Sequence, residues 1–82
     1  MYVDLLYSNV DHLVMAKNIC KRFGQRIKKL RLEKGWSQEK MAEVADFHRT
    51  YIGMVERGER NPSLKSIERF AKAFDVTIKE LF

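Results

Sequence analysis

The 82 residues of the chain predict one domain, with no room for a second, ligand-sensing domain. With 45 % hydrophobic residues, one proline and four glycines, the composition argues against a disordered chain and favours an all-α fold. A net charge of +5 and a pI near 9.6 fit a polyanionic partner, while one cysteine and two distant histidines exclude an intramolecular disulfide and a zinc site.

No apolar run approaches the roughly 20 residues that cross a bilayer. Asp4 and Asp11 stand where a signal peptide would be basic. We therefore expect a cytoplasmic protein without a membrane partner.

Residues 1–18 are interpreted as an N-terminal extension that is helical from about residue 8, with Ser8 as its N-cap and an apolar stripe at Val10, Leu13 and Val14. Whether this helix continues into the next one stays open at this point. A bend near Asn18 or Gly24 would fold the stripe back onto the core. The alternative is an arm that packs on a second subunit.

The next helix is predicted from Ile19 to Lys34, because Phe23, Ile27 and Leu30 recur at helical spacing, and Gly35 is expected to end it. Trp36 follows and is expected to fill a corner between helices, with stacking on a nucleobase as the alternative. Residues 16–34 contain eight Lys or Arg and one Glu. The basic side chains form either a solvated helix face or a face that contacts phosphates.

From Ser37 to Gly58, two short apolar patterns meet across a break that is too tight for a loop. Apolar residues follow i, i+3, i+4 spacing before the break and again after it. Ser37 is a good N-cap for the first helix, and Gly58 supplies a left-handed residue to end the second. The stretch is therefore interpreted as a helix-turn-helix, with Ala42 as the small residue where the helix axes approach. Its apolar positions are Met41, Val44 and Ala45, then Tyr51, Ile52 and Val55.

The last part of the chain predicts two more helices. Pro62 and Ser63 mark the start of the first, which carries an apolar stripe. Thr77 and Glu80 form an S/T-x-x-E capping box that opens a short helix from Ile78 to Phe82. Exposed apolar side chains at this end would be covered most simply by the same patch on a two-fold partner. The stripe consists of Leu64, Ile67, Phe70, Ala71 and Phe74, and the expected dimer surface of Val76, Ile78, Leu81 and Phe82.

The sequence contains no Gly-rich phosphate loop, no carboxylate pair suited to a cleft and no nucleophile beside a base. Ser37 as a helix cap and His48 as a helix-start residue are explained without catalysis, and Cys20 is interpreted as a small buried apolar residue. We expect neither enzymatic activity nor a cofactor or metal.

Several motifs at fixed spacing resemble the Cro/cI type of helix-turn-helix, also called the xenobiotic-response-element family, over residues 19–82. The segments are R-x-x-K-G-W-S-Q-E at residues 31–39, I-x-x-V-E-R-G at residues 52–58, N-P-S-L at residues 61–64 and F-D-V-T-I-K-E-L-F at residues 74–82. The resemblance implies an all-α, five-helix, lambda-repressor-like DNA-binding domain with a C-terminal dimerisation surface, here with an additional N-terminal helical segment. Within the family, H-R-T-Y-I followed by E-R-G-x-R-N-P-S is most similar to the controller proteins of restriction-modification systems.

The resemblance implies a homodimer that binds double-stranded DNA at a near-palindromic operator and regulates transcription without a small-molecule effector. It also implies a structural salt bridge between Arg31 and Glu56 that ties the recognition helix to the scaffold. The alternatives are an antitoxin-type or phage-type repressor, or a protein-interaction module with the same fold.

A recognition helix presents its N-terminal, outward side chains to base edges in the major groove. Arg49 is the best candidate, since its guanidinium can donate two hydrogen bonds to guanine, and Thr50 can meet thymine. Gly53, expected on the same exposed face, would let the helix sit deep in the groove. The base-reading set is His48, Arg49, Thr50 and Met54, and the phosphate-binding set is Gln38, Tyr51, Arg57, Arg60, Asn61 and Lys65. Arg49 as a phosphate clamp and Tyr51 as a core residue are the alternatives.

Overall fold

The computed structural model describes the backbone of residues 9–82 and the side chains from Ile19 onward. The cap predicted at Ser8 and the stripe predicted at residues 10–14 lie outside the described side chains. Within the described part, the chain forms four α-helices and one 3₁₀ helix, so the all-α fold is confirmed and the predicted count of five helices is not. The helices are α2 (Asn9–Glu33), α3 (Gln38–Ala45), α4 (Arg49–Glu56) and α5 (Leu64–Phe74), followed by the 3₁₀ helix η1 (Ile78–Leu81).

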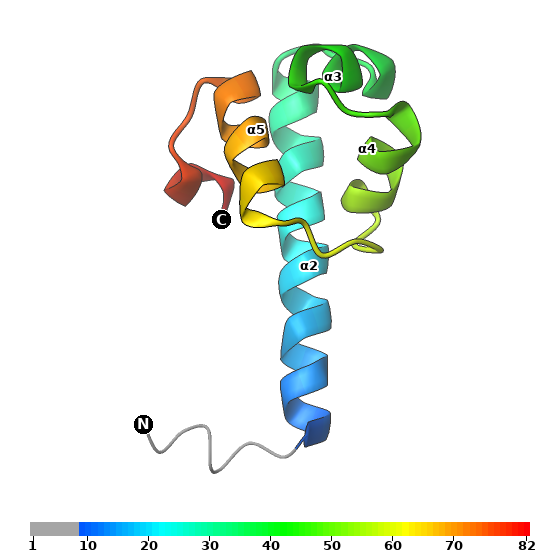
Figure 1. Ribbon diagram of the computed structural model, residues 1–82, viewed down its shortest axis with the longest axis vertical. Helices are drawn as coiled ribbons and strands as arrows, with labels where there is room; N and C mark the ends of the chain where they lie inside the picture. The colour runs from blue at the N-terminus through cyan, green and yellow to red at the C-terminus, as the bar shows by residue number, and fades with distance from the viewer. Residues whose placement is uncertain (1–8) are drawn as a thin grey trace.

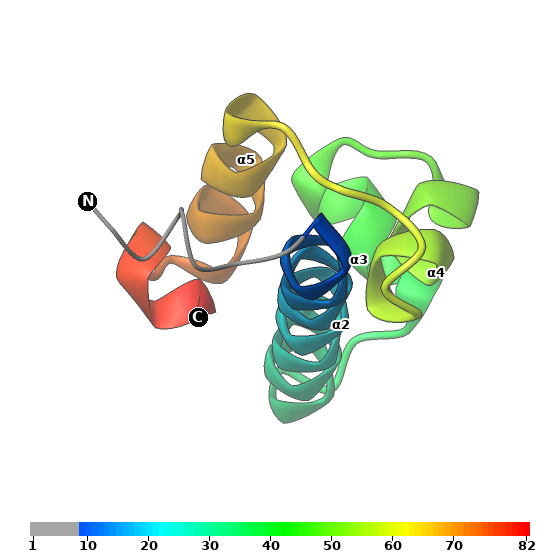
Figure 2. The same ribbon diagram turned by 90° about the horizontal axis from the view of Figure 1, so that it is seen from below.

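Helix α2 is the long axis of the molecule, and it merges the two N-terminal helices whose continuity the sequence left open. It runs without a break through Asn18 and Gly24, where a bend had been considered. Helix α4 packs on one side of its C-terminal half, α5 with η1 packs on the other, and α3 packs against both α4 and α5 (Figures 1 and 2). The long helix therefore positions both halves of the fold.

The ends of α2 and α3 are set by local backbone chemistry. Gly35 adopts φ +74° after α2, and the Trp36 amide donates back to the Arg31 carbonyl at 3.1 Å. Ser37 accepts a hydrogen bond from the Lys40 amide at 3.0 Å and so caps α3 as predicted.

Asp46 ends α3 in the left-handed conformation, with φ 60°, and Asp75 ends α5 in the same way, with φ 58°. Aspartate tolerates this conformation better than most residues with a Cβ. After each aspartate, the next amide donates to the carbonyl five residues before it, so both helices stop sharply. The chain can then turn within three residues into α4.

The core is formed by one cluster of apolar side chains from all five helices. Phe23 meets Phe70 edge to face with ring centroids 5.8 Å apart, and Trp36 stacks on Phe74 at 5.7 Å. Trp36 thus fills the corner between helices that the sequence predicted. The buried apolar members are Phe23, Ile27, Met41, Ala42, Ala45, Ile52, Val55, Phe70, Ala71, Phe74 and Leu81.

Three predictions about apolar side chains are wrong. Leu81, expected on a dimer surface, has no exposed area, because the turn of η1 directs it into the core of its own chain. Leu64 and Val44, expected on buried stripes, are 84 % and 39 % exposed. Leu64 is the first residue of α5, before that helix meets the core, and Val44 lies at the edge of the buried face of α3.

Candidate nucleic-acid interface

The first turn of α4 presents polar side chains to solvent. His48 is the N-cap residue by its backbone geometry, but its side chain makes no capping hydrogen bond. Arg49 and Thr50 follow, and all three are exposed. Within the described part of the chain, none of the three makes a side-chain hydrogen bond, so their donors and acceptors are available to an external partner.

Behind this turn, the end of α4 is fixed by a buried ion pair between Arg31 and Glu56, as the resemblance implied. Arg31 Nε donates to Glu56 Oε2 at 2.6 Å, and Arg31 Nη2 donates to Glu56 Oε1 at 3.1 Å. The side chains are 9 % and 4 % exposed. Arg31 Nη1 donates to the Trp36 carbonyl at 2.8 Å, so the buried guanidinium is also hydrogen bonded to the turn between α2 and α3. The pair holds α4 in one orientation on α2.

Gln38, the first residue of α3, joins the same network. Its Nε2 donates to Glu56 Oε1 at 3.0 Å, which fixes the amide group at the start of the helix. The amide groups at the N-terminus of a helix attract anions. The side chain of Gln38 is therefore held beside a position suited to a phosphate, and Glu56 reaches from the recognition helix to hold it.

Gly53 is buried, although the sequence placed it on the exposed face of α4. The guanidinium of Arg57 covers it: a Cβ on Gly53 would lie 3.2 Å from Arg57 Nη1 and 3.8 Å from Gln38 Oε1. The missing side chain thus makes room for Arg57 along the flank of α4, next to Gln38. The prediction that Gly53 faces the groove is therefore wrong, and its lack of a side chain instead leaves space for the Arg57 guanidinium.

Arg57 is engaged by the acidic residue that follows Gly58. Arg57 Nε donates to Glu59 Oε2 at 2.8 Å, and Arg57 Nη2 donates to Glu59 Oε1 at 3.1 Å. The hydrogen bond from Arg57 lowers the pKa of the Glu59 carboxyl below its ordinary value, and the same bond raises the pKa of Arg57. Both groups are therefore charged, and they form a bidentate pair on the surface.

The other predicted contact residues lie on three elements. Arg60 is exposed and donates from Nε to the Met54 sulfur at 3.3 Å, which ties the loop after α4 to the recognition helix. Tyr51 is half-buried, and its ring centroid lies 4.9 Å from that of Phe47 and 6.5 Å from that of Phe70, on which it stacks. The ring therefore packs against the core. The remaining two, Asn61 and Lys65, are exposed.

The structural roles of two residues, Arg69 and Gly24, were not identified from the sequence. Arg69 of α5 lies over the Phe47 ring at 4.0 Å and donates to the Ala45 and Asp46 carbonyls, so it closes the turn between α3 and α4. Gly24 lies where α2 crosses α4, and a Cβ there would be 2.1 Å from the Val55 carbonyl oxygen. Arg69 carried no local signal and the glycine suggested only a bend, because each residue acts across elements far apart in the sequence.

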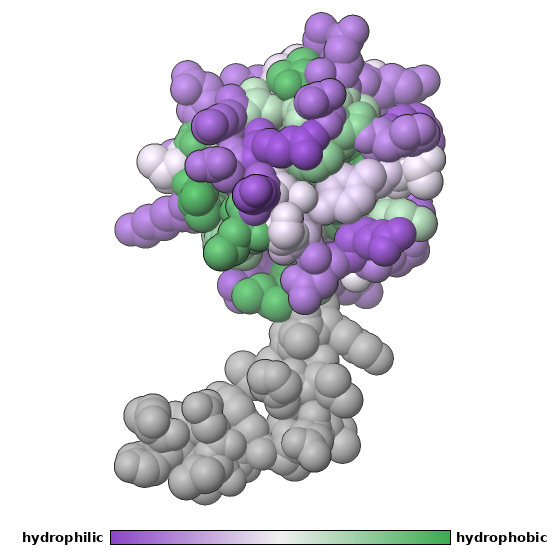
Figure 3. All heavy atoms as spheres, in the orientation of Figure 1, coloured by the Kyte–Doolittle hydropathy of each residue, from purple (hydrophilic) through white to green (hydrophobic). Residues whose placement is uncertain are grey.

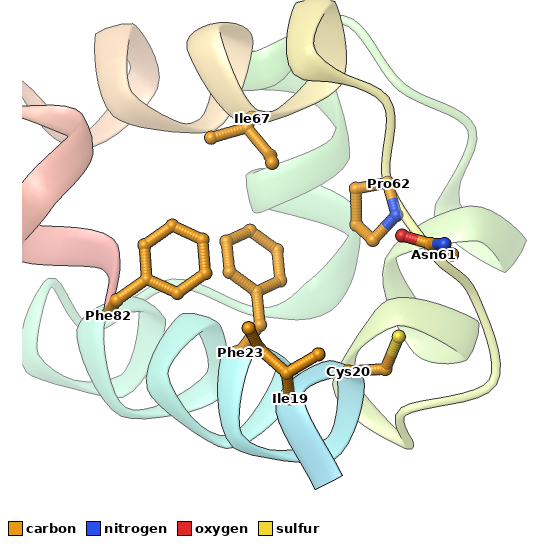
Figure 4. A pocket seen from close by; sticks show the side chains of 7 residues that line it. All are labelled: Ile19, Cys20, Phe23, Asn61, Pro62, Ile67 and Phe82. Atoms are coloured by element: carbon orange, nitrogen blue, oxygen red, sulfur yellow. The ribbon is translucent and has the colours of Figure 1, made fainter. Parts of the chain in front are cut away.

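A second surface lies near the C-terminal segment. Hydrophobic side chains gather there and at the start of α5 (Figure 3). Of the predicted dimer residues, Ile78 and Phe82 are each 49 % exposed and Val76 is half-buried. Phe82 packs against Phe23 with ring centroids 5.3 Å apart and lines a mainly apolar hollow of about 120 Å³ (Figure 4). The hollow is also lined by Ile19, Cys20, Asn61, Pro62 and Ile67.

Other kinds of site find no support in the described residues. No three His, Cys, Asp or Glu side chains of residues 19–82 gather closely enough to hold a metal ion. None of the helices described combines the length and the hydropathy required to cross a membrane.

Comparison with known proteins agrees with this geometry. The helix-turn-helix family HTH_3 matches residues 27–81. Control protein C.BamHI of Bacillus amyloliquefaciens is 50 % identical over 68 residues, which cover 82 % of this chain and 84 % of that protein. Control protein C.MunI of a Mycoplasma species is 45 % identical over 62 residues, which cover 74 % and 84 %.

Solved structures show the same likeness. The restriction-modification controller protein C.AhdI from Aeromonas hydrophila superposes with a TM-score of 0.76 at 46 % identity, covering 79 % of this chain and 98 % of that chain. The controller protein C.Esp1396I, crystallised as a tetramer with its natural 35 base-pair operator, gives a TM-score of 0.67 at 38 % identity, covering 76 % and 92 %. The chain therefore belongs to the Cro/cI-type helix-turn-helix family HTH_3 and is most like its restriction-modification controller proteins.

Proposed function

We propose that the protein is a transcriptional regulator that binds double-stranded DNA as a homodimer on a near-palindromic operator and controls expression of restriction-modification genes. The observation that carries this proposal is the first turn of α4, where Arg49 and Thr50 are exposed on a helix held rigidly by the buried Arg31–Glu56 pair. The similarity to controller proteins, one of them crystallised on its operator, supports it.

In the proposed complex, α4 enters the major groove. Arg49 donates two hydrogen bonds to a guanine, and Thr50, His48 and Met54 contact neighbouring base edges. These contacts discriminate between sequences, whereas contacts to phosphates set the register of the protein on the duplex. The phosphate contacts are assigned to Gln38, Tyr51, Arg57, Arg60, Asn61 and Lys65.

One α4 reads only a few base pairs, so useful specificity requires two recognition helices about 34 Å apart on one face of the duplex. We assign the dimer surface to Ile78 and Phe82, with Val76 at its edge, because Ile78 and Phe82 are half exposed and Phe82 lines the apolar hollow. Residues 1–18 are proposed as an extension of the DNA-binding domain formed by residues 19–82. The regulator is proposed to act in the cytoplasm, without catalysis, cofactor or effector.

The proposal is tested with the fragment upstream of the protein's own gene, by footprinting and by competition against random duplex. Arg49→Ala is expected to lower the ratio of operator to random affinity by about 5-fold to 150-fold, the range for loss of a bidentate base contact. Arg60→Ala is the matched control, since it also removes one arginine.

Arg60→Ala is expected to weaken binding to all duplexes alike and to reduce the salt slope by about 0.9. An unchanged ratio for Arg49→Ala would show that Arg49 reads no base. If the wild-type protein fails to prefer its upstream fragment over random DNA at moderate salt, the regulator proposal is wrong and an interaction module becomes the better reading of this fold.

A further inference from the structure

We propose that Glu59 determines how well the protein distinguishes its operator from other DNA, by holding Arg57 as a directional donor in place of a free positive charge. This inference rests on the proposed DNA-binding function and adds to it a residue that does not itself bind DNA. Its basis is the arrangement of Gln38, Gly53, Arg57 and Glu59 beside the recognition helix.

The pair between Arg57 and Glu59 has a geometry that leaves one side of the guanidinium open. Glu59 accepts from Nε and Nη2 of Arg57 with both of its carboxylate oxygens. Nη1 is the nitrogen that lies over Gly53, on the side of Gln38. The carboxylate thus fixes the plane of the guanidinium and directs Nη1 toward the start of α3, where a phosphate is expected.

Gly53 makes this placement possible. A Cβ at this position would come within 3.2 Å of Arg57 Nη1, which is closer than ordinary van der Waals contact. Gln38 Nε2 donates to Glu56 at 3.0 Å, and the Gln38 atom on the side of Gly53 is the acceptor Oε1. The donors expected to meet a phosphate here are therefore Arg57 Nη1 and the backbone amides of the first turn of α3. A phosphate meets both only when the duplex is in the correct register.

The electrostatic consequence concerns DNA of any sequence. A free arginine releases a counterion at whatever phosphate it meets, and this strengthens operator and random binding together. The Arg57–Glu59 pair has no net charge to add to that attraction, whereas Arg60, which bonds to the Met54 sulfur and has no ion pair among the described residues, keeps its charge. Glu59 therefore weakens sequence-independent binding to DNA, while Nη1 of Arg57 can still donate to one correctly placed phosphate.

The test replaces Glu59 with glutamine and measures the affinity for the operator fragment and for random duplex between 50 and 200 mM salt. Glu59→Gln is expected to strengthen random binding on the order of 5-fold and to steepen its salt slope by about 0.9, as expected for one additional phosphate contact. Operator affinity is expected to change less than about 2-fold, so the ratio falls.

Two control variants separate this mechanism from a simple change of charge. Glu43→Gln removes another exposed carboxylate, which pairs with Lys40 at 3.3 Å on α3, and should leave the ratio of operator to random affinity unchanged. In an Arg57→Met background, Glu59→Gln should also leave it unchanged, because the group that Glu59 controls is gone. Circular dichroism checks that each variant is folded.

The inference would be overturned if Glu59→Gln strengthened operator and random binding equally. It would also be overturned if Glu59→Gln still lowered the ratio of operator to random affinity in the Arg57→Met background. These outcomes leave the proposed function intact, since the wild-type protein still prefers its operator. A wild-type protein without that preference would overturn both.

Discussion

At the scale of single residues, the buried ion pair between Arg31 and Glu56 connects scaffold and recognition helix. The Glu56 carboxylate accepts two hydrogen bonds from Arg31 and one from Gln38, and Arg31 donates one more to the Trp36 carbonyl. The benefit of such a pair over an apolar replacement is small, because desolvation offsets the attraction. Loss of only one partner is different, since the other charge is left buried and unpaired.

Glu56→Leu is therefore expected to lower the free energy of unfolding by about 3 to 5 kcal/mol, measured by urea denaturation. The double variant Arg31→Met/Glu56→Leu should recover much of that loss, because no unpaired charge remains. Operator binding by the double variant should stay weak, since Gln38 has lost the carboxylate that fixes its amide. Equal stability of the single and double variants would contradict the account.

Gly24 is a second residue whose role follows from one contact. In an exposed helix, Gly→Ala stabilises by about 0.5 to 1 kcal/mol through helix propensity. Here the added methyl group would meet the carbonyl oxygens of Val55 and Glu56 at 2.1 and 2.8 Å, and these are backbone atoms that cannot rotate away. We expect Gly24→Ala to destabilise the fold by about 1 to 3 kcal/mol.

Thermal unfolding of Gly24→Ala measures this effect, and Gln25→Ala, an exposed neighbour on the same helix, is the control. The control should be close to neutral. A Gly24→Ala protein more stable than wild type would mean that α2 and α4 do not cross at this residue.

At the scale of elements, local signals in the sequence were sufficient for most of the fold. The cap at Ser37, the tight break after α3 and the capping box at Thr77 each depend on residues within one turn of each other. The Arg31–Glu56 pair spans 25 residues and came from family resemblance, since periodicity does not indicate which charges meet. The exposed first turn of α4 followed from the same helix-turn-helix interpretation.

What the sequence did not reveal depends on packing between distant segments. A glycine in α2 suggested a bend, and only its contact with α4 shows that it is a crossing point. Leu81 belongs to an apolar chain end, and only the turn of η1 decides that it faces inward while Ile78 faces solvent. Arg69 looked like an ordinary polar residue of α5 until Phe47 and the turn carbonyls were placed beneath it.

The capping box of η1 makes a prediction about pH. Backbone and side-chain hydrogen bonds from Thr77 lower the pKa of the Glu80 carboxyl, and the charge of Arg26 adds to this. A carboxyl with a lowered pKa in the folded state stabilises the fold above its unfolded pKa, and the contribution is lost as the pH falls through the folded value. Arg26 also donates to the Glu80 carbonyl at 2.8 Å, which attaches η1 to α2.

Glu80→Gln should therefore have a lower melting temperature than wild type at pH 7, and the difference should shrink as the pH falls below about 4.5, toward full protonation of the wild-type carboxyl. Melting curves of both proteins from pH 7 to pH 3 measure it. If the difference in melting temperature stayed constant across this range, the effect would come from the shape of the side chain and not from its charge.

At the scale of the whole molecule, the two proposed surfaces depend on each other. The recognition helix reads too few base pairs by itself, and the apolar region around Ile78 and Phe82 would bring two copies together. Phe82 also packs on Phe23, so changing it would disturb the monomer. Ile78, which is half exposed, is the better residue for separating dimerisation from folding.

Ile78→Asp is expected to weaken the dimer by about 10-fold to 150-fold, because fully burying an isoleucine contributes about 1.5 to 3 kcal/mol, roughly half of the side chain is still exposed in the monomer, and a two-fold interface contains it twice. Leu32→Asp introduces the same charge at another exposed apolar side chain, on α2 beside Lys28 and Lys29, and should leave association unchanged. Sedimentation measures the mass of each variant across micromolar concentrations, and urea denaturation at low concentration checks that the monomer is intact. Because a monomer places only one α4 on the operator, Ile78→Asp should also lose most of its preference for the operator over random DNA. A dimer that survives this substitution would move the interface away from the C-terminal region.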